Sequence, residues 1–190
     1  LQIELSGYYM YLQDMIRFTK GIFGAQYQNF GEMRTLGVEF EVKADIFPFL
    51  YTYGNATYQD LRDVRSHEEG SNIPNATKGK RMPNIPYFMG NAGLEFHKEN
   101  LFGGKGQNTR LFVDLAFVEE YLYDFEITEN AKRRIPRSTT IDLGFEYSFM
   151  NQRLFISGKI KNLTSSTILS EFNRPLPGRS FGVKLRYVFR

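Results

Sequence analysis

The alternation of apolar and polar residues constrains the fold of this 190-residue chain more than any other feature. It is strictest between residues 140 and 149, where every second side chain is apolar: Ile141, Leu143, Phe145, Tyr147 and Phe149. Successive side chains of a β-strand point to opposite faces of the sheet, whereas a helix would scatter these residues around its surface. The segment is therefore predicted to be a strand with one apolar face and one polar face.

The same period predicts further strands along the chain. It is clear in residues 38–44, 154–161 and 181–189, and weaker in residues 3–11, 50–59, 87–97 and 111–123. The polar segment 26–34 is interpreted as an extension of the strand at 38–44. Helical periodicity is almost absent, so these segments predict an all-β fold of about eight strands.

The connections between these segments alternate between short and long. Short breaks fall at 45–48, 99–108 and 150–152, and long polar runs occupy residues 61–83, 124–137 and 163–177. This alternation predicts an antiparallel up-and-down meander with turns at one end and large loops at the other. Transmembrane β-barrels of bacterial outer membranes have this arrangement, with short periplasmic turns and longer external loops.

The composition excludes several other classes of protein. No apolar run approaches the roughly 20 residues of a membrane-spanning helix, and 18 Phe with 12 Tyr are too many for a disordered chain. Cysteine is absent, and a net charge of +3 spread along the chain does not favour nucleic-acid binding. Since the sequence contains no phosphate-binding loop, Ser/His/Asp arrangement or zinc-ligand spacing, we expect no enzyme activity, no cofactor and no metal site.

Alternation alone does not decide whether the apolar face packs into a core or contacts lipid. A soluble β-barrel or β-sandwich that binds a ligand, and a small self-closed outer-membrane barrel, therefore stay open as alternatives. Two features favour lipid. Full charges crowd the polar faces, as at Glu39, Glu41 and Lys159, and tyrosines gather near strand ends, as at Tyr9 and Tyr121. Charged side chains suit a wide aqueous lumen, and Tyr is favoured at the depth of lipid headgroups.

Several short sequences, in order along the chain, carry a family resemblance. Asn162 and Leu163 end a strand, Pro-Gly-Arg follows at 177–179, and a last alternating strand reaches Phe189. Upstream, Gly-Val-Glu occurs at 37–39, and a basic segment with Pro-X-X-Pro occurs at 80–86. In this order and spacing the chain resembles the C-terminal end of TonB-dependent outer-membrane receptors, with the departure that Arg190 follows the usual terminal Phe.

The resemblance implies that residues 1–190 are the C-terminal portion of a 22-stranded transmembrane β-barrel, with the plug domain absent from this chain. Eight strands could close alone, but side chains just fill the interior of an eight-stranded barrel, and the charged polar faces would crowd it. Receptors of this family actively take up scarce nutrients such as iron chelates, haem, cobalamin or glycans. The implied location is the outer membrane of a Gram-negative bacterium. The implied partners are outer-membrane lipid, the rest of the barrel and the plug, TonB acting through the plug, the barrel-assembly machinery and a nutrient.

The alternation and the resemblance together give three sets of candidate site residues. The side chains expected to face lipid are Ile141, Leu143, Phe145, Val183, Leu185 and Tyr187. The last strand also resembles the signal that the assembly machinery reads, carried by Phe181, Tyr187 and Phe189, and strand addition would supply the affinity. A basic cluster predicts contact with an anionic substrate or with lipid phosphates, because Arg binds such oxyanions bidentately. Its members are Lys132, Arg133, Arg134 and Arg137.

Overall fold

A computed structural model describes residues 1–190 apart from 22–23, 30, 69–70, 126–132, 172–173 and 190. Eight strands form one sheet: β1 (Gln2–Leu12), β4 (Met33–Phe47), β5 (Leu50–Asp63), β6 (Phe88–Glu99), β7 (Asn108–Val118), β10 (Ser138–Phe149), β11 (Leu154–Lys161) and β14 (Ser180–Tyr187). Six short strands form three two-stranded ribbons: β2 (Ile16–Gly21) with β3 (Gly24–Asn29), β8 (Tyr121–Leu122) with β9 (Arg134–Ile135), and β12 (Leu169–Glu171) with β13 (Arg174–Pro175). The described residues contain no helix long and apolar enough to cross a membrane.

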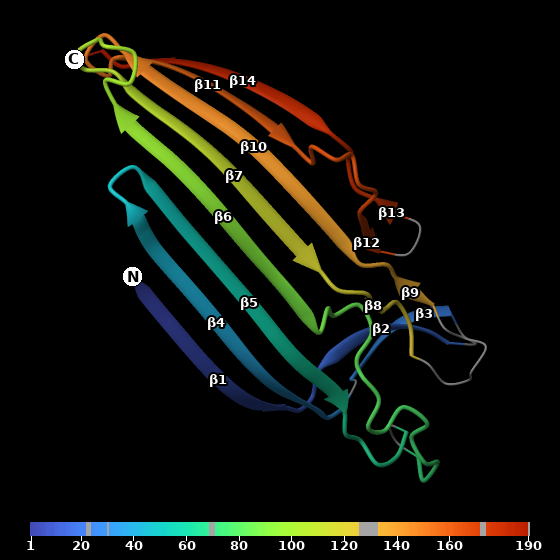
Figure 1. The fold of residues 1–190 in the computed structure, drawn as a ribbon. Helices are drawn as coiled ribbons and strands as arrows, with labels where there is room; N and C mark the ends of the chain where they lie inside the picture. The colour runs from blue at the N-terminus through green and yellow to red at the C-terminus, as the bar shows by residue number, and fades with distance from the viewer. Residues whose placement is uncertain (22–23, 30, 69–70, 126–132, 172–173, 190) are drawn as a thin grey trace.

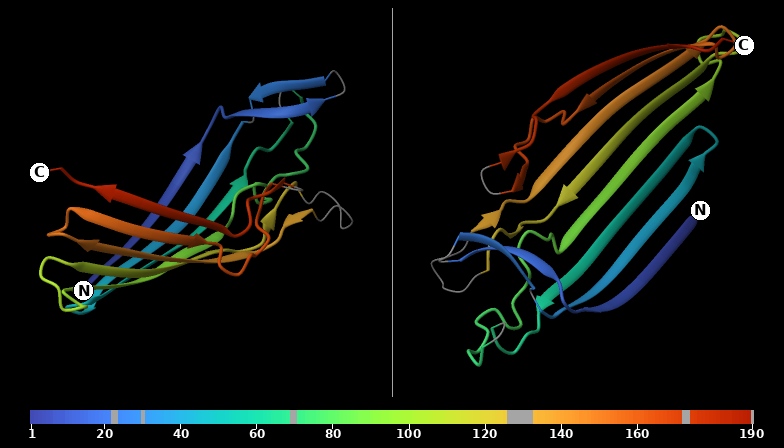
Figure 2. Two further views of the ribbon diagram at one scale, coloured as in Figure 1. Left: turned by 90° about the horizontal axis from the view of Figure 1, so that it is seen from above. Right: turned by 180° about the vertical axis from the view of Figure 1, so that it is seen from behind.

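The eight long strands lie in a single curved layer, in the order β1-β4-β5-β6-β7-β10-β11-β14 (Figure 1). Every neighbouring pair is antiparallel, so the sheet is the meander that the alternation predicts. β1 and β14 each pair on one side only, which leaves the described sheet open at both edges. Seen from above in Figure 2, these two edge strands cross at a steep angle, as the right-handed twist of strands leads us to expect.

Short and long connections separate to opposite ends of the sheet, as predicted. Short turns join β4 to β5, β6 to β7 and β10 to β11 at one end, called the turn end below. The long connections, which carry the three ribbons, all lie at the other end, called the loop end (Figure 1). Transmembrane β-barrels show the same division between turns and loops.

Residues 26–34 differ from the expectation of one long extension of β4. Residues 26–29 belong to β3, which pairs with β2 in a separate ribbon, and β4 begins only at Met33. Gly31 lies between β3 and β4 with a φ of 72°, a conformation that glycine adopts readily and that interrupts an extended strand. A Cβ at Gly31 would also come within 2.2 Å of Cδ of Arg65, so both backbone and space favour glycine there.

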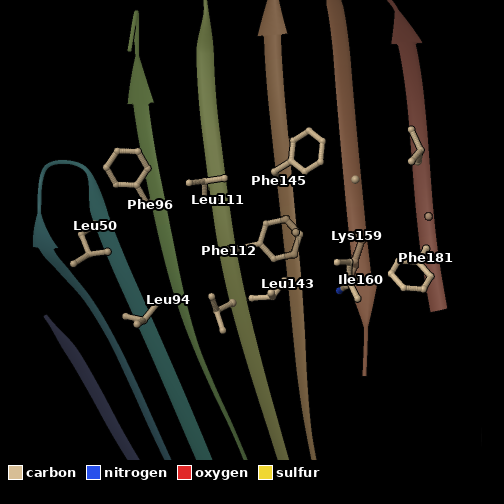
Figure 3. Close-up of a pocket in the computed structure, with 15 residues that line it drawn as sticks. Leu50, Leu94, Phe96, Leu111, Phe112, Leu143, Phe145, Lys159, Ile160 and Phe181 are labelled. Carbon is tan, nitrogen blue, oxygen red and sulfur yellow. The ribbon is translucent and has the colours of Figure 1, made fainter. Parts of the chain in front are cut away.

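The register divides the side chains of the sheet into an apolar face and a polar face. One row of directly paired residues on the apolar face runs across six strands: Leu50, Phe96, Leu111, Phe145, Gly158 and Val183. Figure 3 shows Phe96, Leu111 and Phe145 side by side on β6, β7 and β10. Positions one residue along each strand point the other way and form the polar face, as in the row Tyr53, Gly93, Asp114 and Asp142.

The described chain has almost no hydrophobic core. Its buried hydrophobic side chains are Met33, Phe125 and Ile135, of which Met33 and Phe125 pack together at the loop end. The total exposed surface is 13098 Å², whereas a compact monomer of this size exposes about 9,300 Å². Within the residues that the structure describes, no second sheet covers the apolar face. This open layer does not match the compact β-sandwich considered from the sequence.

Candidate functional site

The six residues predicted to face lipid share the apolar face: Ile141, Leu143, Phe145, Val183, Leu185 and Tyr187. Val183 and Leu185, on the edge strand, are 84% and 69% exposed, and Phe145 is 45% exposed although it lies within the sheet. The ring of Phe145 lies over Gly158 on the next strand, where a Cβ would come within 2.4 Å of ring carbon Cε1. A hollow of about 500 Å³ is lined by three of the six, Leu143, Phe145 and Val183, together with neighbours such as Phe96 and Leu111 (Figure 3). The face is therefore continuous, apolar and uncovered in the described chain.

Aromatic rings border the apolar face at both ends. At the loop end, the rings of Phe88 and Phe117 lie edge to face with centroids 6.0 Å apart. At the turn end, Phe49 with Phe96 and Tyr187 with Phe189 form edge-to-face pairs, and Tyr147 stacks on Phe149. Nine residues of β6, from Phe88 to Phe96, join the two borders, and a tilted strand needs about 9–11 residues to cross a bilayer. The face has the length and the aromatic girdles of a lipid-facing barrel surface.

The polar face carries a connected network of charged and aromatic side chains. Tyr53 donates a hydrogen bond to Asp114 (Oη to Oδ1, 2.7 Å), across β6. Lys159 on β11 reaches Asp142 (Nζ to Oδ2, 3.4 Å) and Asp114 (3.7 Å), and its ammonium lies 5.4 Å from the centre of the Phe112 ring. These contacts link strands from β5 to β11, so the polar face is stiffened by side chains as well as by the backbone ladder.

Charge is distributed unevenly over the polar face. Its β1 and β4 side carries Glu4, Glu39 and Glu41, with Lys43 paired to Glu41, whereas its β11 and β14 side carries Lys159, Lys161, Lys184 and Arg186. Charged side chains of this kind require water or opposite charges around them, because burying a charge without a partner is costly. None of the described residues forms a cluster of three or more His, Asp or Glu side chains that could hold a metal ion.

Three aromatic rings on the polar face lie flat over glycines of the neighbouring strand, a feature that the sequence analysis missed. The pairs are Tyr8 with Gly37, Tyr53 with Gly93, and Phe112 with Gly144, and each pair is in direct register. A Cβ at any of these glycines would come within 2.1–2.3 Å of a ring carbon. Glycine therefore lets each ring lie against the sheet instead of projecting from it, a device that also pins strand register.

Asp63 organises the connection between β5 and β6, beyond the aromatic border of the loop end. Its side chain has no exposed surface, and its carboxylate accepts hydrogen bonds from the side chains of Arg65 (2.9 Å), Asn75 (3.0 Å) and Thr77 (2.6 Å). Burial acts to raise the pKa of Asp63, but these hydrogen bonds outweigh burial and hold the pKa below its ordinary value. The ionised carboxylate thus fixes the loop, and the sequence analysis did not identify it.

A polar cleft of about 510 Å³, called the arginine cleft below, lies at the loop end. It is lined by Arg62, Lys80, Arg81, Tyr87, Glu120 and Arg134, among others. Asp60 accepts hydrogen bonds from Arg62 (Nε to Oδ2, 2.6 Å) and from Arg81 (Nε to Oδ1, 2.8 Å). The guanidinium of Arg81 also lies 4.4 Å from the centre of the Tyr87 ring. The cleft therefore presents guanidinium groups held in fixed positions.

The structure divides the basic cluster that the sequence predicted. Arg134 lies in the arginine cleft and pairs with Glu120 (Nη1 to Oε1, 2.8 Å). Arg133 and Arg137 are exposed and do not line the cleft, and Lys132 lies outside the described residues. The cleft's other basic residues come from the end of β5 and from the connection between β5 and β6, so they were not part of the predicted cluster.

The residues predicted to form the assembly signal lie at the C-terminal edge of the sheet. Phe181 and Tyr187 belong to β14, which pairs only with β11, and Phe189 follows it. Their side chains are 72%, 47% and 88% exposed, respectively. An edge strand of this kind offers an unpaired row of backbone donors and acceptors to another chain.

Comparisons with known proteins agree with this two-faced sheet. The model of the TonB dependent receptor-like, beta-barrel family matches residues 1–163. Among solved structures, the ferric yersiniabactin uptake receptor FyuA from Yersinia pestis is 17% identical, with a TM-score of 0.74 over 99% of this chain and 27% of that chain. The copper transporter OprC is 18% identical, with a TM-score of 0.71 over 99% of this chain and 29% of that chain.

A third structure is similar to the same extent. The ferric preacinetobactin receptor BauA from Acinetobacter baumannii is 16% identical, with a TM-score of 0.72 over 97% of this chain and 27% of that chain. No curated protein sequence matches the chain. The chain thus spans less than a third of each of these three solved structures. Because the family model covers most of the chain, the open eight-stranded sheet belongs to the β-barrel family of TonB-dependent receptors.

Proposed function

We propose that residues 1–190 form the C-terminal portion of a 22-stranded barrel in the outer membrane of a Gram-negative bacterium. One observation carries this proposal: a single sheet has an uncovered apolar face on one side and a charged polar face on the other. Inside lipid, every backbone N–H and C=O needs a partner, so only a closed barrel is stable there. The open edges at β1 and β14 are where further strands would pair, and this favours a larger barrel over a small self-closed one.

In this arrangement the apolar face contacts lipid and the polar face lines an aqueous lumen. The turn end then lies on the periplasmic side and the loop end lies outside the cell, as in other outer-membrane barrels. The lumen would hold the plug domain and water, and the opposite charges of the two sides of the polar face would bind charged groups of the plug. TonB would act on the plug to drive transport, so the barrel portion acts as a wall and not as a catalyst.

The function that this supports best is active uptake of a scarce nutrient from outside the cell. The candidates are an iron chelate, haem, cobalamin or a glycan, and a ferric siderophore has support from the comparisons. FyuA and BauA are described as receptors for ferric yersiniabactin and ferric preacinetobactin, and they share this fold. The polar face and the loop end would supply part of the substrate path.

The last strand would have a second role during membrane insertion. Phe181, Tyr187 and Phe189 lie on one face at an edge whose backbone groups are unpaired. The barrel-assembly machinery would pair with this edge by strand addition, with the alternate aromatic side chains giving specificity.

Uptake by cells tests the proposed function. The experiment compares three strains under nutrient limitation: wild-type cells, cells lacking the gene for the full receptor, and cells lacking TonB. Each strain would be given radiolabelled ferric siderophores, haem, cobalamin and oligosaccharides. We expect uptake of one of these substrates to be lost in both deletion strains and to return with the intact gene. Equal uptake of every substrate in all three strains would contradict the proposal.

A further inference from the structure

Lys98 on β6 places a positive charge on the apolar side of the sheet. It follows Phe96 on the same side of the strand, one step closer to the turn end. From Tyr58 and Phe88 to the turn end, Lys98 is the only charged side chain that the register of the eight described strands places on the apolar face. Lys98 is exposed, so its stem can follow the apolar surface while its ammonium extends towards lipid headgroups.

Tyr147 on β10 lies in the same row of directly paired residues as Lys98. The row runs through Lys98, Thr109 and Tyr147, and two steps between neighbouring strands place the backbones of Lys98 and Tyr147 about 10 Å apart. Thr109 is small and buried, so it does not separate the ammonium from the hydroxyl. Among the described residues, neither the Lys98 ammonium nor the Tyr147 hydroxyl has a hydrogen-bond or ion-pair partner. The row therefore offers a cation and a hydroxyl donor to a ligand.

Two aromatic contacts hold the Tyr147 ring at the turn end. The ring stacks on Phe149 with centroids 5.8 Å apart, and it lies edge to face with Phe102 at 5.7 Å. Phe102 belongs to the turn that follows β6 and is 71% exposed. Lys98 thus lies beside aromatic rings of the kind that gather where hydrocarbon meets lipid headgroups.

The hollow of the apolar face begins directly next to this row, on the side away from the turn end. It is lined by the row from Leu50 to Val183 and by the following row from Leu94 to Phe181 (Figure 3). Gly158 has no side chain and the Phe145 ring lies over it, which lowers the surface between the larger side chains. An acyl chain in this hollow would gain van der Waals contacts with its floor and its sides.

We propose that Lys98 and Tyr147 bind the phosphate of a phospholipid in the periplasmic leaflet, and that one acyl chain of this lipid lies in the hollow. The proposal rests on the proposed function, because it requires the apolar face to contact lipid and the turn end to lie on the periplasmic side. An ammonium and a phenolic hydroxyl both donate hydrogen bonds to phosphate oxygens. A free phosphate ion has the same oxygens but leaves the hollow empty, so the continuity of row and hollow favours a lipid.

Native mass spectrometry of the full receptor in detergent tests this lipid site. The probes are phosphatidylglycerol, diacylglycerol with the same acyl chains, and inorganic phosphate. Wild-type receptor should retain phosphatidylglycerol in preference to diacylglycerol. Lys98→Gln removes a charge-assisted hydrogen bond and should weaken phosphatidylglycerol binding at least about tenfold, whereas Lys98→Arg should retain it. The matched control is Lys161→Gln, which removes an exposed charge from the polar face and should leave lipid binding unchanged.

A second pair of variants tests the hollow. Val113 lines it, so Val113→Trp should fill it and reduce retention of phosphatidylglycerol. Leu115 is the next residue on the same side of β7 and does not line the hollow, so Leu115→Trp should have no effect.

Equal retention of the two lipids by wild-type receptor would overturn the proposal, as would an undiminished preference in Lys98→Gln. Retention of inorganic phosphate without a preference between the lipids would overturn it too. Receptor that enters the outer membrane as a folded barrel and gives one of these results would contradict this lipid site alone, whereas receptor absent from that membrane would contradict the proposed function.

Discussion

Replacing Asp63 with alanine should open the loop of residues 64–80 and leave the sheet intact. The Asp63 carboxylate is fully buried and accepts hydrogen bonds from Arg65, Asn75 and Thr77. Removing one partner of a buried ion pair costs about 3–5 kcal/mol. The side chain of Arg65 is only 12% exposed, so water replaces the lost acceptor poorly. We expect the substitution to cost about 3 kcal/mol, at the lower end of this range, because the loop can relax towards solvent.

Hydrogen exchange of the full receptor in detergent measures this effect directly. A loss of about 3 kcal/mol in the free energy of loop opening should speed exchange of amides such as Gly79 and Thr77 roughly 100-fold. The amide of Gly79 donates a hydrogen bond to the Asp63 carbonyl, and the amide of Thr77 donates one to the Asn75 side chain. Exchange of both amides therefore measures opening of the loop. The matched control is Glu68→Ala, which removes an exposed carboxylate of the same loop. Equal exchange in the two variants would refute the reasoning.

Acid should have the same effect on the wild-type loop. The pKa of Asp63 lies below the ordinary value of 3.8, so the closed loop binds fewer protons than the open loop. Its stabilisation is complete above the ordinary value and is lost as the pH falls through the lower pKa of the closed loop. After correction for the pH dependence of the intrinsic exchange rate, amide exchange in the loop should therefore stay constant between neutral pH and pH values just above 3.8. Below that pH the loop should open and its amides should exchange faster.

Two further predictions concern the sheet itself. Leu143→Arg on the apolar face should destabilise the barrel in lipid vesicles by about 2–4 kcal/mol, whereas Thr140→Arg on the polar face of the same strand should have little effect, as urea unfolding would show. Gly144→Ala would place a Cβ 2.1 Å from Cζ of Phe112 and should cost about 1–3 kcal/mol. Gly182→Ala meets open space and should stay within about 0.5 kcal/mol of wild type in the same assay. Equal effects of Leu143→Arg and Thr140→Arg would contradict the assigned faces. Equal effects of Gly144→Ala and Gly182→Ala would contradict the packing of Phe112 over Gly144.

The sequence was sufficient for features that depend on neighbouring residues along one strand. The two-residue period at Ile141 to Phe149 predicts a strand and its two faces because alternation is local to the backbone. The lengths of the connections predict the meander, since short turns join antiparallel neighbours. Residues 26–29 were misassigned because a polar extended segment fits either an extension of β4 or a separate ribbon, and pairing with β2 decides between them.

Contacts across the chain could not be predicted in the same way. Phe112 lies over Gly144 only because of the register between β7 and β10, and a period of two residues does not fix register. Asp63 meets Asn75 and Thr77 through an irregular loop without any period. The predicted basic cluster contributed Arg134 to the cleft but missed Arg62 and Arg81, because a run of charges in sequence does not show which segments meet in space.

The orientation of the sheet is tested most directly by spin labels along β10 of the full receptor in lipid bilayers. Single cysteines are simple to introduce in this segment because the 190 residues contain none. Labels at positions 141, 143 and 145 should collide frequently with oxygen dissolved in the lipid, and labels at 140, 142 and 146 should not, which gives a period of two residues. If the labels at positions 141, 143 and 145 are immobile and shielded from oxygen, the apolar face packs inside protein, contrary to this account.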